Sequence, residues 1–273
     1  MRLKKLTVFL LTAFSICACE KESPVTALPR LKSLTSVGAN SLGKTEFYYN
    51  ADGNLFQTTH SMNGNKDLFT EYYYLSGKIE TAKTFWVISG TAPKLKAETD
   101  FKYSGGKLVS VEIKTLDDAS APNGGVNYHF DYSDGEIPIV NVTYPKPIIP
   151  SAYQDSLRSP NQGSITFEEY PTNASPEQIP LIDCEFDNKS NPLYSQPFLS
   201  AFRFTFGGTE QFSVSFNPQL FFFKNNITKT KTLGSGLHTT EYKYNQLGLP
   251  VSSVWRTDFP VGLKSETLYE YGQ

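Results

Sequence analysis

The chain has 273 residues, of which 25 are basic and 27 acidic, and its formal net charge is −2. A charge this close to balance lacks the basic excess that phosphate backbones attract, so we expect no nucleic-acid partner. Sequence motifs, taken in order from the N-terminus, distinguish among the remaining functional classes.

Residues 1–18 have the features of an export signal. A basic start is followed by the apolar stretch Leu6–Ile16, which is too short to span a bilayer. The stretch ends Ile16-Cys17-Ala18-Cys19, which resembles the lipobox of bacterial lipoproteins: an aliphatic residue, two small residues and the cysteine that is lipidated. This resemblance implies that Cys19 carries the lipid, and the alternative is an ordinary secretory signal cut nearby.

Residues 19–30 are polar and contain proline, so we expect a short lipidated tether. Glu20 and Glu22 resemble the surface-export signals of Bacteroidota lipoproteins. The predicted partner of this segment is a membrane, and the predicted location is the outer membrane, at the cell surface or on its periplasmic face. Only Cys184 would then remain as a free thiol, so no internal disulfide is expected.

A short pattern recurs along the rest of the chain: two aromatic residues two positions apart, a polar turn with glycine, and an aliphatic run. Side chains at i and i+2 share one face of a strand, so each aromatic pair predicts a strand with one packed face. Turn sequences such as Asp52-Gly53 predict that each copy is a hairpin. The aromatic pairs are Phe47/Tyr49, Tyr72/Tyr74, Phe101/Tyr103, Phe130/Tyr132 and Tyr242/Tyr244.

The repeats predict an all-β fold, an antiparallel meander of hairpins that curls into a barrel-like or strongly curved sheet. Residues 31–273 would form this single domain. The proline-rich stretch 144–180 interrupts the pattern, and because proline lacks a ladder donor we expect loop or edge strand there. Beyond it, the alternating Phe202, Phe204 and Phe206 predict a buried strand.

The stretch Gly38–Thr45 fits the phosphate-loop pattern G-x-x-x-x-G-K-[ST]. That chemistry requires a helix that begins at Lys44, with its N-terminus facing the phosphates. The next residues, Glu46–Asn50, instead belong to the first aromatic strand. We therefore interpret the stretch as a hairpin and expect no nucleotide ligand.

The aromatic-turn-glycine units resemble YD repeats. Taken in order, Phe186–Pro192, Lys224–Ile227 and Glu241–Pro250 are similar to the motifs of a Bacteroidota lipoprotein family of unknown function. The similarity extends over residues 31–273. It implies a porin-like, antiparallel β fold, and it implies neither an activity nor catalytic residues.

The sequence contains no recognisable catalytic, metal or cofactor motif. His60, His129 and His238 lie far apart, and there is no G-x-S-x-G turn. We therefore expect no catalytic residue, no metal, no cofactor and no enzymatic turnover. A glycan hydrolase built from scattered carboxylates is the distant alternative.

Two other functions agree better with these features. The first is a non-enzymatic binding module whose ligand is a glycan or an envelope protein, and the second is a structural or assembly component of the envelope. If a ligand binds, aromatic side chains outside the packed pairs, such as Trp86, Trp255 or Tyr48, are the expected contacts.

Overall fold

The structure is a computed structural model that carries side chains, and its described residues are 29–38, 42–116, 125–133, 138–143, 153–161, 164–171, 183–206, 209–232, 236–258 and 264–272. The predicted signal, Cys19 and most of the tether lie outside these ranges.

Strands make up almost all of the described chain. The first eleven are β1 (Arg30–Val37), β2 (Leu42–Tyr49), β3 (Leu55–Met62), β4 (Asn65–Leu75), β5 (Lys78–Trp86), β6 (Lys94–Ser104), β7 (Lys107–Thr115), β8 (Gly125–Asp131), β9 (Ile139–Thr143), β10 (Tyr153–Asn161) and β11 (Ser164–Pro171). The others are β12 (Asp183–Ser190), β13 (Leu199–Phe206), β14 (Thr209–Phe216), β15 (Asn225–Thr232), β16 (Gly236–Tyr244), β17 (Pro250–Thr257) and β18 (Lys264–Gly272), with one short helix, α1 (Pro218–Phe222).

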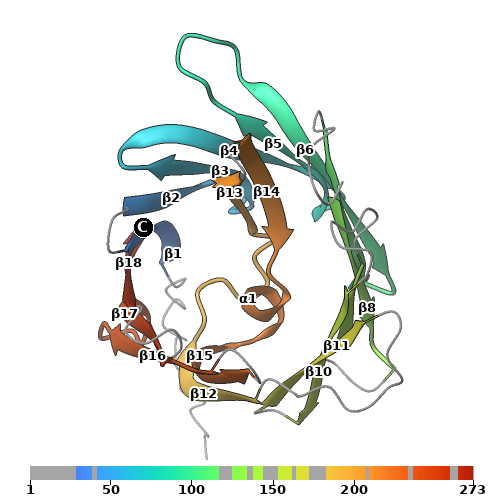
Figure 1. Ribbon diagram of the computed structural model, residues 1–273, viewed down its shortest axis with the longest axis vertical. Coiled ribbons are helices and arrows are strands. Elements are labelled where there is room, and N and C mark those ends of the chain that lie inside the picture. The colour runs from blue at the N-terminus through green and yellow to red at the C-terminus, as the bar shows by residue number, and fades with distance from the viewer. Residues whose placement is uncertain are drawn as a thin grey trace, which may run out of the picture.

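The predicted antiparallel β fold is confirmed. Within the described ranges, sixteen strands form one sheet in the order β11 to β1, then β18 to β15, then β12. The sheet curls into a ring, as Figure 1 shows. Its two edge strands, β11 and β12, come close together, but no described ladder joins them, so the sheet is strongly curved rather than closed.

The aromatic repeats produce this curvature in a regular way. In four of the hairpins the register shifts by one residue between the middle residue and the second aromatic of the pair. Each of these hairpins therefore contains a β-bulge at that point. Bulges bend a strand and increase its twist. The shifts fall at Tyr49, Tyr74, Tyr103 and Tyr244.

The two faces of the curled sheet differ in chemistry. The first aromatics of the pairs point inward, and Tyr72 and Phe130, for example, are 4% and 2% exposed. The residues between the aromatics point outward, as the 44% exposure of Tyr73 illustrates. Cross-strand ion pairs lie on this outer face, including Lys114–Asp100 at 2.9 Å. The outer face is therefore polar and exposed, and the hydrophobic core lies inside the ring.

The inside of the ring is filled by the chain's own phenylalanine-rich segment. The hairpin β13–β14 and helix α1 lie within the curl of the sheet (Figure 1). Phe216 contacts Tyr128 and Phe130 edge-on, with ring centroids 5.7 Å and 5.9 Å apart. The alternation at Phe202, Phe204 and Phe206 does fall on a strand, β13, whereas Phe221 and Phe222 end helix α1 and Phe223 follows it.

The structure also places described residues of the phosphate-loop-like stretch and of the proline-rich stretch in strands. Lys44 and Thr45 lie inside β2, opposite Thr35 and Leu34 of β1, so no helix begins at Lys44. The proline-rich stretch contributes β10 and the edge strand β11. Across the described ranges, no helix has the length and apolar character needed to cross a membrane.

Candidate functional site

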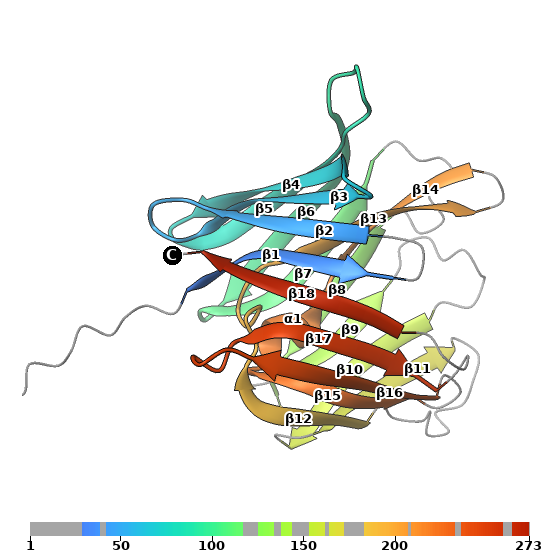
Figure 2. The same cartoon turned by 90° about the vertical axis from the view of Figure 1, so that its left-hand side faces the viewer.

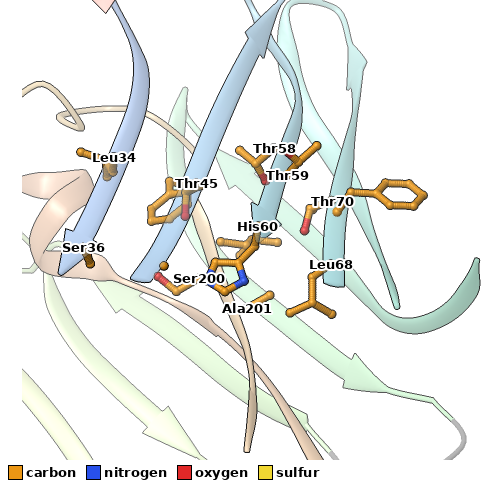
Figure 3. A pocket seen from close by; sticks show the side chains of 14 residues that line it. Leu34, Ser36, Thr45, Thr58, Thr59, His60, Leu68, Thr70, Ser200 and Ala201 are labelled. Carbon is orange, nitrogen blue, oxygen red and sulfur yellow. The ribbon is translucent and has the colours of Figure 1, made fainter. Parts of the chain in front are cut away.

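A pocket of about 290 Å³ lies between the inner face of β1–β4 and the first residues of β13. Figure 3 shows the side chains that surround it. The lining combines apolar side chains with several hydroxyl groups and one imidazole. Its residues are Leu34, Ser36, Gly43, Thr45, Thr58, Thr59, His60, Leu68, Phe69, Thr70, Phe198, Leu199, Ser200 and Ala201.

The imidazole of His60 is the distinctive polar group of the pocket. Register pairing places Thr45, His60 and Leu68 in one row across β2, β3 and β4. The residue before Leu68, Asp67, is the extra residue of a β-bulge in β4. Its side chain is only 8% exposed, and its Oδ1 lies 2.9 Å from His60 Nδ1.

This contact fixes the orientation of the ring. A carboxylate can only accept a hydrogen bond, so the hydrogen of the neutral imidazole lies on Nδ1. The other nitrogen, Nε2, then presents its lone pair, and it has no partner among the described residues. A Cβ built on Gly43, another lining residue, would lie 3.7 Å from Nε2. With the ring neutral, the pocket therefore contains one oriented acceptor.

The wall of the pocket is held together by hydroxyl contacts. Tyr72 Oη accepts a hydrogen bond from the backbone N–H of Leu199 at 3.2 Å and lies 3.4 Å from Thr58 Oγ1. Thr70 and Thr84 share a hydrogen bond of 2.9 Å. Burial raises the pKa of Tyr72 to about 12, so this hydroxyl stays protonated at neutral pH. The base of β13 is thereby tied to the sheet beside the pocket.

The arrangement is suited to binding. It offers hydroxyl groups that can donate and accept, apolar patches such as Leu34 and Phe198, and a single oriented ring nitrogen. None of the described lining residues is an aspartate, glutamate, lysine or arginine. The described hydrogen bonds include none from a serine hydroxyl to His60.

The three aromatic residues that the sequence suggested as ligand contacts do not come together. Trp86 is the last residue of β5 and is half-buried, and the Lys96 amino group lies 5.0 Å from the centre of its ring. Trp255 stacks on His238, with centroids 5.3 Å apart. Tyr48 is on the outer face beside Phe56, and the two are 39% and 44% exposed. None of the three lines the pocket.

The motifs that resembled a family do come together, in a cluster that shares no residue with the lining of the pocket. Asp187 of β12 accepts a hydrogen bond from Tyr244 of β16. The side-chain amide of Asn226 in β15 lies 3.3 Å from Asp187 Oδ2 and 3.4 Å from Tyr244 Oη. Each motif supplies one member of this polar cluster, which joins three strands near one edge of the sheet.

The Lys44 amino group, which a phosphate-loop interpretation would direct at a nucleotide, instead pairs with Glu46 Oε1 at 2.9 Å. This hydrogen bond raises the pKa of Lys44 and lowers the pKa of Glu46. Two other residues of the same motif, Gly43 and Thr45, line the pocket as strand residues.

Comparison with known proteins adds little to this geometry. No family model matches the chain, and no curated protein matches it either. Among solved structures it is similar to a porin-like protein from Bacteroides uniformis, with a TM-score of 0.39 and 12% sequence identity, over 89% of this chain and 96% of that chain. The functional argument therefore depends on the pocket.

Proposed function

We propose that this protein is a lipid-anchored component of the outer membrane, displayed at the cell surface, that binds a ligand and does not transform it. The observation that carries the proposal is the pocket beside β13, with its hydroxyl groups and its oriented imidazole. Small-ligand sites are typically concave, largely apolar and equipped with a few convergent polar groups, and this pocket fits that description near the lower end of their size range.

The chemistry of the pocket supports binding over glycan cleavage. Glycosidases generally need two carboxyl groups on either side of the bond that is cut. The described lining residues include none, since Asp67 lies behind His60 and is occupied by it. The exposed ion pairs of the outer face support a sheet whose outer surface is in contact with water.

The binding function can be tested on a glycan array, with the full-length protein purified in detergent. A second arm would capture envelope proteins from the same cells. We expect Ala201→Leu, which fills the pocket, to abolish the binding signal. The matched control, Tyr48→Ala on the outer face, should leave it unchanged. Binding that survives Ala201→Leu but is lost in Tyr48→Ala would assign function to the outer face instead.

The same preparation tests the absence of turnover. Incubation with each bound saccharide should return it intact. Cleavage that a single Asp or Glu substitution abolishes would show that the protein is a hydrolase.

The anchor is a separate prediction. Metabolic labelling with palmitate should mark the wild-type protein and leave Cys19→Ser unlabelled, because the lipobox resemblance makes Cys19 the modified residue. The matched control is Cys17→Ser, which should still be labelled. Label that persists in Cys19→Ser would refute the assignment.

A further inference from the structure

We propose that the pocket binds an uncharged, hydroxyl-bearing ring of the kind found in sugars, and that Nε2 of His60 accepts a hydrogen bond from one of its hydroxyl groups. This inference deepens the proposed function and rests on it. It specifies the chemical class of the ligand and the residue that recognises it by a hydrogen bond.

The absence of charge in the lining argues for an uncharged ligand. Moving an ionised group into a partly buried pocket is costly unless an opposite charge receives it. The described lining residues contain no lysine, arginine, aspartate or glutamate. Among the described residues, two carboxylates contact lining residues from behind, and both are already engaged: Asp67 with His60 Nδ1 at 2.9 Å, and Glu46 with Lys44 at 2.9 Å and Thr59 at 3.4 Å. A charged ligand would therefore lose its hydration without compensation.

The polar groups of the lining argue for hydroxyl groups on the ligand. Ser36, Thr45 and Ser200 can each donate and accept. His60 Nε2 differs from them because it can only accept while the ring is neutral, so it requires a donor. A hydroxyl group satisfies both kinds of partner.

The apolar part of the lining argues for a ring. Leu34 and Leu68 come from the sheet, and Phe198 lies just before β13, where its ring is 5.3 Å from that of Phe47. Sugar rings combine an apolar C–H face with hydroxyl groups at the edge, which matches a pocket with both surfaces. A volume of about 290 Å³ suits one such ring rather than several. The ring can be a free monosaccharide or the terminal unit of a glycan.

Calorimetric titration of the full-length protein would test the ligand class. The neutral probes are methyl α-D-glucopyranoside, methyl β-D-galactopyranoside and N-acetylglucosamine, and their charged counterparts are D-glucuronate, D-galacturonate and D-glucosamine. We expect at least one neutral probe to bind, and its charged counterpart to bind at least about tenfold more weakly. Oligosaccharides that end in the same unit distinguish a free monosaccharide from the terminal unit of a glycan. A pocket for a glycan end binds these oligosaccharides, whereas a pocket for the free sugar does not.

Two substitutions separate the two nitrogens of His60. In His60→Asn the amide takes the place of Nδ1 and keeps Asp67 paired, but no atom replaces Nε2, so affinity should fall about five- to tenfold. In His60→Gln the amide oxygen takes the place of Nε2, so affinity should be largely kept. Equal loss in both variants would overturn the role of Nε2.

A measurement on the wild-type protein covers the case in which these variants do not fold. The chain has three histidines, so the nitrogen NMR signals of His60 can be assigned. We expect the Nε2 signal to shift on addition of the neutral sugar while Nδ1 stays protonated. An unchanged Nε2 signal at saturating sugar would overturn the proposal.

The failure of this inference differs from the failure of the proposed function. Charged probes that bind as tightly as neutral ones, with binding lost in Ala201→Leu, would overturn the ligand class and leave the pocket as a binding site. Ligands that bind with no effect of Ala201→Leu would overturn both.

Discussion

At the scale of single residues, the polar cluster near the edge of the sheet shows how buried groups are satisfied. Asn226 is 5% exposed, and its amide lies among oxygens of Asp187, Tyr244 and the backbone carbonyls of Lys189 and Ser190, at 3.3 to 3.5 Å. Buried polar groups that lose a partner destabilise a fold more than exposed ones do. The cluster should therefore be sensitive to small changes.

Tyr244→Phe removes the hydroxyl group that donates to Asp187, and it leaves the carboxylate short of a partner. We expect the free energy of unfolding to fall by about 1–3 kcal/mol, measured by urea denaturation. The matched control is Lys243→Ser on the adjacent outward position, which should cost about 0.5 kcal/mol or less. Similar losses for the two variants would contradict the strand register.

His60 and Asp67 show what the sequence does and does not reveal about the site. The turn between them, Asn63-Gly64, is a recognisable hairpin signal, and both residues adopt positive φ. A simple hairpin register does not indicate which residue bulges, and the bulge is what directs Asp67 toward His60. The hairpin was predictable, but the residue pair was not, because a one-residue shift decides it.

At the scale of the elements, the second tyrosine of three aromatic pairs contacts the preceding hairpin; the third pair, Tyr269/Tyr271, is a further copy of the pattern at the end of β18. Tyr74 donates to the carbonyl of Leu55, Tyr132 to that of Leu108 and Tyr271 to that of Pro250, at 2.8 to 2.9 Å. Each acceptor lies just after a turn. In these three repeats the pattern is thus more than one of burial, because the second hydroxyl group also satisfies a carbonyl of the preceding hairpin.

Tyr271→Phe tests these contacts. Removal of the hydroxyl group leaves the carbonyl of Pro250 without this donor, so we expect a loss of about 1 kcal/mol in unfolding free energy. In the control Tyr48→Phe, the lost hydrogen bond to Glu46 is exposed and water can replace it, so the cost should be close to zero. A control that loses as much as Tyr271→Phe would show that the inward geometry adds nothing.

At the scale of the whole molecule, the aromatic pattern predicted the all-β fold because alternation along a strand is a local property. The internal position of β13, β14 and α1 was not predictable in the same way. Phe216 and its neighbours are apolar wherever they pack, and apolarity alone does not distinguish a strand in the sheet from one inside its curl. That choice depends on contacts between distant parts of the chain.

Burial of tyrosines inside the ring should limit the stability of the fold at alkaline pH. Desolvation raises the pKa of Tyr49, Tyr72 and Tyr103 from 10 to about 12. The unfolded chain then releases these protons at a lower pH than the folded one. The stabilisation is complete below about pH 10 and is lost as the pH rises toward about 12.

Urea denaturation at about pH 9 and about pH 11 should show this loss, on the order of 1–2 kcal/mol for the fully buried Tyr72 alone. The absorbance of tyrosinate in the folded protein should rise later than in urea. In the control Tyr72→Phe, the pH-dependent loss should be smaller by that amount. A free energy of unfolding that is constant over this range would contradict the burial of these hydroxyl groups.

The pairing of β1 with β18 has a consequence for the order in which the protein can fold. The two strands lie side by side (Figure 2), and Ser33 donates to Glu270 across a sequence separation of 237 residues. During synthesis, β1 can pair with β2 early, but its other edge stays open until β18 emerges. This interior junction of the sheet is therefore completed late, and the high contact order favours slow folding after the chain is released. A truncation that removes β18 would divide the described sheet into blocks of eleven and four strands instead of shortening it at an edge.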